Sequence, residues 1–107
     1  MVREAQQEEA PSHFDRRGNP ISQDEWIRLS RDVTYPIVRT ETLPNGYHVK
    51  TVWSGVYNST SLGKPRIFKT IVLSGHPVEL VDVYTYVTEE ESLAGHALAV
   101  ERWSRGP

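Results

Sequence analysis

Apolar and polar residues follow two different periods along this chain, and the change of period predicts its elements. Between residues 34 and 87 apolar side chains recur at alternate positions, which is typical of half-buried β-strands. On either side of this region they recur every three or four residues, which is typical of amphipathic helices. The pattern therefore predicts a short helix, a group of strands and a second helix, in that order.

The strands are expected to form an antiparallel meander. Pro44, Asn45 and Gly46 are a turn signal between the first two strands, because Asn and Gly tolerate the left-handed region of the backbone. The other connections are also short, which favours pairing between neighbours in sequence. The side of the second strand that is the better candidate for burial carries Tyr47, Val49, Thr51, Trp53 and Tyr57. The expected strands are residues 37–43, 47–57, 66–74 and 80–87.

The C-terminal helix begins at a capping signal. Thr88 can accept a hydrogen bond from the first turn, and Glu91 stands in the reciprocal position of a capping box. The helix is expected to run to about Trp103, before Gly106 and Pro107 end it. The side expected to face the sheet carries Leu93, His96, Ala97, Val100 and Trp103.

A shorter helix is expected at residues 23–31, where Ser22 and Glu25 repeat the capping signal. A helix of this length needs a surface to dock on. It could cover the second face of the sheet, lie beside the longer helix or close an edge. If one face stays bare, a homodimer across that face is one outcome.

These elements predict one α+β domain over residues 13–107, with an antiparallel sheet of about four strands and a helix packed on it. Residues 1–12 lack an apolar stripe and are rich in Glu and Gln, so we expect a flexible acidic arm. This polar start does not resemble a signal peptide, and no segment approaches the roughly 20 apolar residues of a membrane span. The sequence favours a cytosolic protein.

Charge and composition exclude several kinds of function. The net charge is -2, and acidic and basic residues are interspersed, which is not the basic footprint of a duplex-DNA-binding protein. The chain has no cysteine, which excludes a disulfide scaffold and a thiol nucleophile. The absence of cysteine is also typical of a reducing compartment.

No motif for catalysis or for metal binding is present. His13, His48, His76 and His96 have no ligand spacing, and we expect His96 to be a half-buried packing residue. The run of glutamates at 89–91 is explained by helix capping and by the helix dipole, since consecutive helical residues do not point at one ion. We therefore expect no enzymatic activity, no cofactor and no metal site.

Aromatic residues are numerous for a domain of this size, with three Trp and five Tyr. Most are expected to fill a thin core, and the others can supply a binding surface. Trp, Tyr and Arg dominate hot spots in protein interfaces, so a protein partner is favoured. Single-stranded nucleic acid or a nucleotide, stacked on the sheet beside the lysines, is the alternative. The candidate binding surface consists of Trp26, Lys50, Trp53, Tyr57, Lys69, Tyr84 and Tyr86.

Several stretches between residues 14 and 100 resemble, in order, a family of small uncharacterised proteins encoded by actinobacterial phages and prophages. The resemblance implies action in the cytoplasm of a bacterial host, and it transfers no catalytic residue. It is compatible with an accessory protein that binds a host or defence factor, and with a small virion component. The stretches that carry it are residues 18–21 (GNPI), 25–26 (EW), 49–55 (VKTVWSG), 65–70 (PRIFKT), 86–91 (YVTEEE) and 94–96 (AGH).

Overall fold

The computed structural model describes residues 11–56 and 64–106. Residues 1–10 of the predicted acidic arm, and Tyr57, lie outside the described ranges. The elements follow the predicted order of one helix, four strands and one helix. They are α1 (Gln23–Ser30), β1 (Ile37–Thr42), β2 (His48–Trp53), β3 (Phe68–Leu73), β4 (Leu80–Tyr86) and α2 (Glu89–Ser104).

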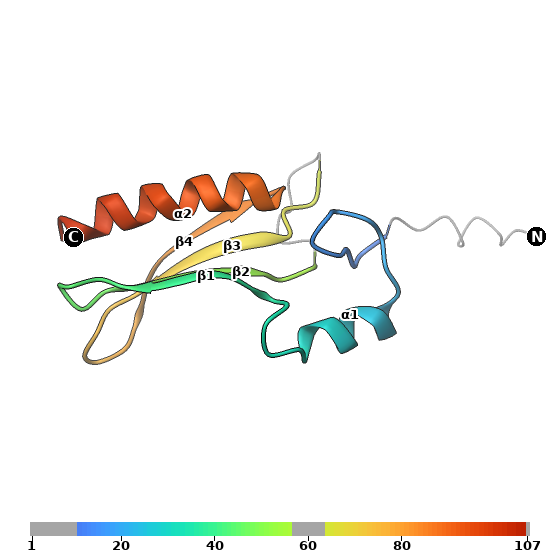
Figure 1. Cartoon of the computed structure of the whole chain (residues 1–107), viewed down its shortest axis with the longest axis horizontal. Helices are drawn as coiled ribbons and strands as arrows, with labels where there is room; N and C mark the ends of the chain where they lie inside the picture. Colours follow the sequence, from blue (N-terminus) through green and yellow to red (C-terminus); the bar gives the residue numbers. More distant parts are fainter. Residues whose placement is uncertain (1–10, 57–63, 107) are drawn as a thin grey trace, which may run out of the picture.

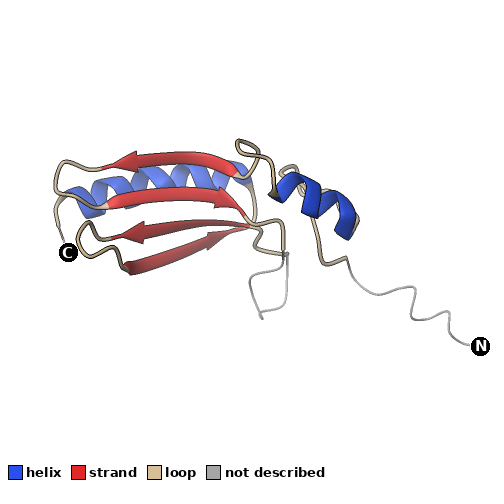
Figure 2. Ribbon diagram, turned by 90° about the horizontal axis from the view of Figure 1, so that it is seen from below, coloured by secondary structure: helices blue, strands red, loops and turns tan. Residues whose placement is uncertain are grey.

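The four strands form one antiparallel sheet in the order β1-β2-β3-β4, which confirms the predicted meander (Figure 2). The hairpin between β1 and β2 closes through a hydrogen bond from the Leu43 amide to the Tyr47 carbonyl, at 2.7 Å. Gly46 has a φ of 97° within this turn, which a residue with a Cβ rarely adopts. The residue types of the turn therefore fix the register of the first two strands.

α2 lies along one face of the sheet, roughly in the direction of the strands, and contacts all four of them (Figures 1 and 2). Its N-cap is Thr88, whose hydroxyl accepts from the Glu91 amide at 3.1 Å, as predicted. The Glu91 carboxylate accepts from the amide of Val87, one residue before the cap. At the other end, the Asn45 side chain donates to the Trp103 carbonyl at 2.7 Å. Both ends of the helix are thus tied to the sheet.

The side of α2 that faces the sheet differs from the prediction. Leu93 and Ala97, which were expected to be buried, are exposed. His96 and Trp103 are buried as expected, but the other residues of the buried stripe are smaller or polar ones. The buried residues of the helix are Ser92, His96, Ala99 and Trp103. The rotation follows from His96, because both nitrogens of its ring find hydrogen-bond partners on the sheet.

The core has two parts. Between α2 and the sheet lie Val49 and Val72, both fully buried, together with Trp103. The second part lies at the end of the sheet near α1, around Trp53 and Phe68. It also receives Trp26 from α1.

α1 covers neither face of the sheet. It begins at the predicted Ser22 cap and lies beyond the end of the strands (Figure 1). Its link to the sheet end is Trp26, whose indole N–H donates to the Ser54 carbonyl at 2.9 Å. α1 has no fully buried residue and extends the end of the domain. Among residues 11–56 and 64–106, no helix covers the second face of the sheet (Figure 2).

Candidate functional site

The face of the sheet opposite α2, which we call the bare face, carries three rows of side chains that run across the strands. The pairing of the strands places Lys69 beside Val52 in the first row and Lys50 beside Ile71 in the second. The rows are Ile37–Val52–Lys69–Thr85, Thr40–Lys50–Ile71–Val83 and Thr42–His48–Leu73–Leu80. These rows contain apolar, hydroxyl and basic side chains and no carboxylate.

Apolar side chains on the bare face are open to solvent. Ile37 is 41% exposed and Val83 is 43% exposed, at opposite edges of the sheet. Between the strands and the β3–β4 hairpin the face is hollowed, with a volume of about 670 Å³ bounded by Leu73, Lys50 and Val78. Glu41, whose carboxylate contacts His96, also borders this hollow. The hairpin bends toward this side of the sheet in Figure 1. An exposed apolar surface of this kind is typical of an interaction site.

The predicted binding surface is not one surface. Lys50 and Lys69 lie on the bare face. Trp53 is only 2% exposed, and its indole N–H donates to the Phe14 carbonyl at 3.0 Å, so its assignment to a binding surface was wrong. Trp26 packs against the same buried cluster. Tyr57 lies outside the described residues.

Tyr84 and Tyr86 lie on the side of the sheet that α2 covers. Both are half-buried and line a groove between β4 and the helix. The Tyr84 hydroxyl donates to Asp82 at 2.6 Å, and the Tyr86 hydroxyl donates to Thr70 at 3.1 Å. Partial burial raises the pKa of the Tyr86 hydroxyl. The two tyrosines are thus separated from both lysines by the thickness of the sheet.

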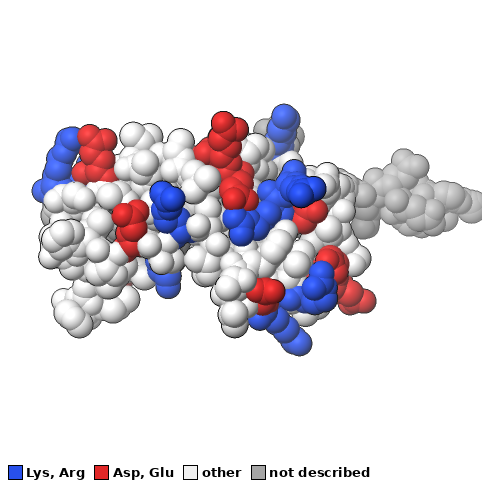
Figure 3. All heavy atoms as spheres, in the orientation of Figure 1, with Lys and Arg blue, Asp and Glu red and all other residues white. Residues whose placement is uncertain are grey.

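The separation of the tyrosines from the lysines is unfavourable for the alternative ligand, a nucleotide or single-stranded nucleic acid. Stacking platforms place aromatic rings and cations on the same surface. The three rows of the bare face hold Lys50 and Lys69 but no Trp, Tyr or Phe. On the side drawn in Figure 3, acidic and basic side chains are interspersed rather than gathered in a basic stripe. The three rows of the bare face therefore do not form a stacking platform of this kind.

A chain of polar groups lies buried between α2 and the sheet. His96 Nδ1 is 2.7 Å from the Thr51 hydroxyl, and His96 Nε2 is 2.7 Å from a Glu41 carboxylate oxygen. Thr51 is in turn 2.5 Å from the Thr70 hydroxyl, which accepts from Tyr86. We expected a half-buried histidine, whereas the ring is buried and fully bonded.

The order hydroxyl, imidazole, carboxylate is also that of a nucleophilic triad. Here the hydroxyl of Thr51 belongs to a residue that is 0% exposed, and its neighbour Thr70 is equally buried. A substrate carbonyl needs direct contact with the nucleophile, so this arrangement cannot react in the folded protein. Its role is to hold the helix on the sheet.

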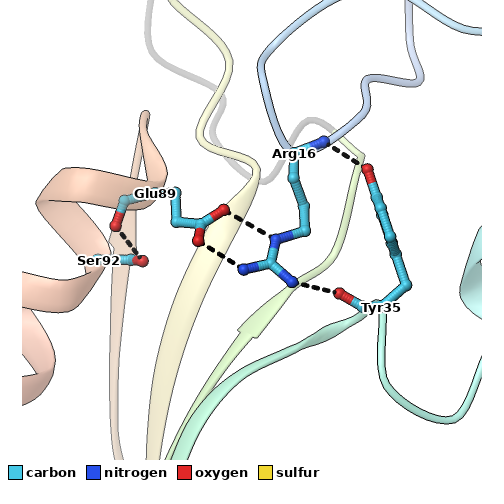
Figure 4. Close-up of polar contacts among 4 residues, drawn as sticks. All are labelled: Arg16, Tyr35, Glu89 and Ser92. Carbon is cyan, nitrogen blue, oxygen red and sulfur yellow. Dashed lines mark hydrogen bonds and ion pairs between the residues drawn. The ribbon is translucent and has the colours of Figure 1, made fainter.

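A second set of polar contacts joins the N-terminal segment to the start of α2 (Figure 4). Arg16 binds the Glu89 carboxylate with two nitrogens, Nε at 2.8 Å, and donates through Nη1 to the Tyr35 carbonyl. The hydrogen bonds that Arg16 donates to Glu89 lower the pKa of the Glu89 carboxyl, and the same bonds raise the pKa of Arg16. Glu89 is therefore occupied by Arg16, while Glu91 caps the helix.

The glutamates at 89–91 are explained by the helix and by Arg16. Among the described residues, no group of three His, Asp or Glu side chains is placed to hold a metal ion. No helix in the described ranges is long and apolar enough to cross a membrane.

No protein-family model matches the chain, and no curated protein or solved structure is significantly similar to it. The resemblance to phage-encoded proteins therefore stays a prediction. An uncovered face of the sheet was one of the expected outcomes, because the sequence predicts only one long helix to pack on it. The groove beside Tyr84 was missed, because the wrong side of α2 was expected to face the sheet.

Proposed function

We propose that the protein is a non-enzymatic accessory protein of phage origin, which acts in the bacterial cytoplasm by binding another protein through its bare face. The observation that carries the proposal is the composition of that face. Lys50 and Lys69 stand among exposed and half-buried aliphatic side chains, and no carboxylate lies in the three rows to neutralise them. The complementary partner is a protein surface with acidic residues around an apolar centre.

A second copy of the same chain is a poorer partner. Two bare faces packed together would bring four lysines into one interface, from Lys50 and Lys69 of each copy. Buried like charges cost several kcal/mol, of the order that separates partners from non-partners. Charge thus favours a different, acidic protein, which under the resemblance would be a host or defence factor.

The proposal is tested with charge-reversed variants. Lys50→Glu combined with Lys69→Glu removes the basic character of the bare face, and Arg17→Glu combined with Arg31→Glu changes the net charge equally at exposed sites elsewhere. Proteins captured from an actinobacterial host lysate by the wild type are purified, and direct binding is measured by calorimetry. We expect the lysine variant to lose binding, the arginine variant to keep it, and wild-type affinity to fall with added salt.

Three results would overturn the proposal. The first is capture of the same proteins by both variants with equal affinity. The second is failure to reconstitute binding with any purified candidate. The third is a dimer of the chain itself that Val83→Asp dissociates, measured by light scattering, because Val83 lies at the edge of the bare face.

A further inference from the structure

A second hollow lies on the other side of the sheet, between α2 and the edge strand β4. Its volume is about 460 Å³. The rings of Tyr84 and Tyr86 form one wall, and the helix contributes Gly95 and Ala99 to the other. A Cβ on Gly95 would lie 2.2 Å from the Tyr86 ring, so the groove exists in this form because residue 95 is a glycine. The volume is in the range of sites that bind small molecules or single side chains.

The rim of this groove exposes a large apolar side chain. Leu98 lines the groove and is 66% exposed. A single exposed leucine is ordinary on a protein surface. Here it is continuous with two tyrosine rings and two small helix residues, and together they form a concave apolar patch. Such a patch is stabilised when an apolar side chain of a ligand displaces its water.

One end of the groove is lined by the charged side chains of Glu101, Arg102 and Arg105. Arg102 lines the groove, and its guanidinium lies 5.1 Å from the centre of the Trp103 ring. No carboxylate among the described residues pairs with it, whereas neighbouring Arg105 is bound to Glu101 at 2.9 Å. Arg102 follows Leu98 by four positions, which on a helix is about 6 Å along the axis.

The backbone of β4 is partly occupied by side chains of the same chain. The Val83 amide donates to Asp82 at 2.9 Å, and the Thr85 carbonyl accepts from Arg66 at 2.9 Å. Addition of a further strand at this edge would compete with both contacts. Recognition at the groove is therefore expected to use side chains rather than a new β-ladder.

We propose that the groove binds a peptide segment in which a large apolar side chain is followed, about 6 Å further along, by a carboxylate. The apolar side chain enters between the tyrosine rings and α2, beside Leu98. The carboxylate pairs with the guanidinium of Arg102. The site is independent of the bare face, which lies on the opposite side of the sheet, so either proposal can fail alone.

The test uses two peptides, N-acetyl-Phe-Ala-Glu-amide and its Gln counterpart, in millimolar titrations followed by NMR amide shifts. In an extended chain the Phe and Glu side chains are two residues apart, about 6.6 Å, which matches the groove. We expect shifts at Tyr84, Tyr86, Gly95 and Leu98, and about fivefold tighter binding of the Glu peptide, since one charge-assisted contact distinguishes the two.

Three variants separate the contributions. Arg102→Gln should bring the affinity for the Glu peptide down to that for the Gln peptide. Leu98→Ser should weaken both peptides by the same factor. Arg31→Gln, at an exposed position of the α1 C-cap, should change neither affinity.

Absence of shifts at the groove in the wild type would overturn the proposal. Equal affinity for the two peptides would also overturn it, because Arg102 would then make no contact. Shifts confined to the bare face would also overturn it, because the peptide would then bind on the opposite side of the sheet. Concentration-dependent shifts at the groove without peptide would identify a second copy of the chain as the occupant, and would refute the peptide proposal.

Discussion

Gly95 is the position at which a single methyl group most directly tests the packing of α2 on the sheet. A Cβ built on Gly95 would lie 2.2–2.3 Å from three atoms of the Tyr86 side chain, including its hydroxyl oxygen. No side chain tolerates such a contact, so the ring must move. Movement would break the hydrogen bond from Tyr86 to Thr70, at 3.1 Å, which links the ring to the buried polar chain.

The expected cost of Gly95→Ala combines opposing effects. Overpacking costs about 1–3 kcal/mol, and the lost hydrogen bond costs about 1 kcal/mol. Ala in a helix interior is more favourable than Gly by about 1 kcal/mol, which offsets part of this. We expect a net loss of roughly 1–3 kcal/mol in the free energy of unfolding.

A double-mutant cycle isolates the contact between Gly95 and Tyr86. In a Tyr86→Ala background the ring is absent, so Gly95→Ala should stabilise the protein by about 1 kcal/mol. The exposed neighbour Ala94 supplies the control, because Ala94→Gly should cost about the same propensity without any packing change. The free energies are measured by urea unfolding followed by circular dichroism.

The sign of the Gly95→Ala effect on stability shows whether the Tyr86 ring lies against Gly95. If the substitution stabilises the wild type as much as it stabilises the Tyr86→Ala variant, the ring does not lie against Gly95. The groove between β4 and α2 would then lack one of its walls, and the side of α2 that faces the sheet would have to be different. A sign change between the two backgrounds supports the observed rotation of the helix.

Other residues give further expectations, each measured by urea unfolding. Thr88→Ala should cost about 1 kcal/mol, because the Glu91 amide loses its acceptor. His96→Ala should cost about 3 kcal/mol, since it opens a cavity and leaves the buried Thr51 without its imidazole partner. Arg16 holds the pKa of Glu89 below its ordinary value, so their pair stabilises the fold above about pH 4.3 and less as the pH falls further. The stability difference between wild type and Arg16→Ala should therefore stay constant from pH 7 down to about pH 4.3 and shrink as the pH falls further, and a difference that does not change at low pH would contradict the ion pair.

Local signals explain why so much of the fold was predictable. Thr88 and Ser22 cap the helices at the predicted residues, because a cap depends only on its own first turn. The turn at Gly46 and the alternation on β2 likewise act between neighbouring residues. Val49, Thr51 and Trp53 are all buried, as their shared parity predicted.

The rest depends on contacts between distant residues, which periodicity does not contain. The rotation of α2 is set by His96, whose partners Thr51 and Glu41 come from two strands. A rule based on hydrophobicity counts Leu93 as core and His96 as flank, whereas the observed order is the reverse. Arg16 and Glu89 are 73 residues apart, and only the folded chain brings them together.

The composition of the bare face differs from that of a sheet face that is normally buried under a second layer of structure. Each of its three cross-strand rows contains two aliphatic residues, one lysine or histidine, and one threonine. An ordinary second layer would bury Lys50 and Lys69 without carboxylates, which costs more than the aliphatic contacts return. The same rows in contact with water are stable, because the lysine heads and the threonine hydroxyls are hydrated. A surface of this kind is best matched by a partner that brings both aliphatic and acidic groups, since only such a partner stabilises the face without leaving a buried charge unpaired.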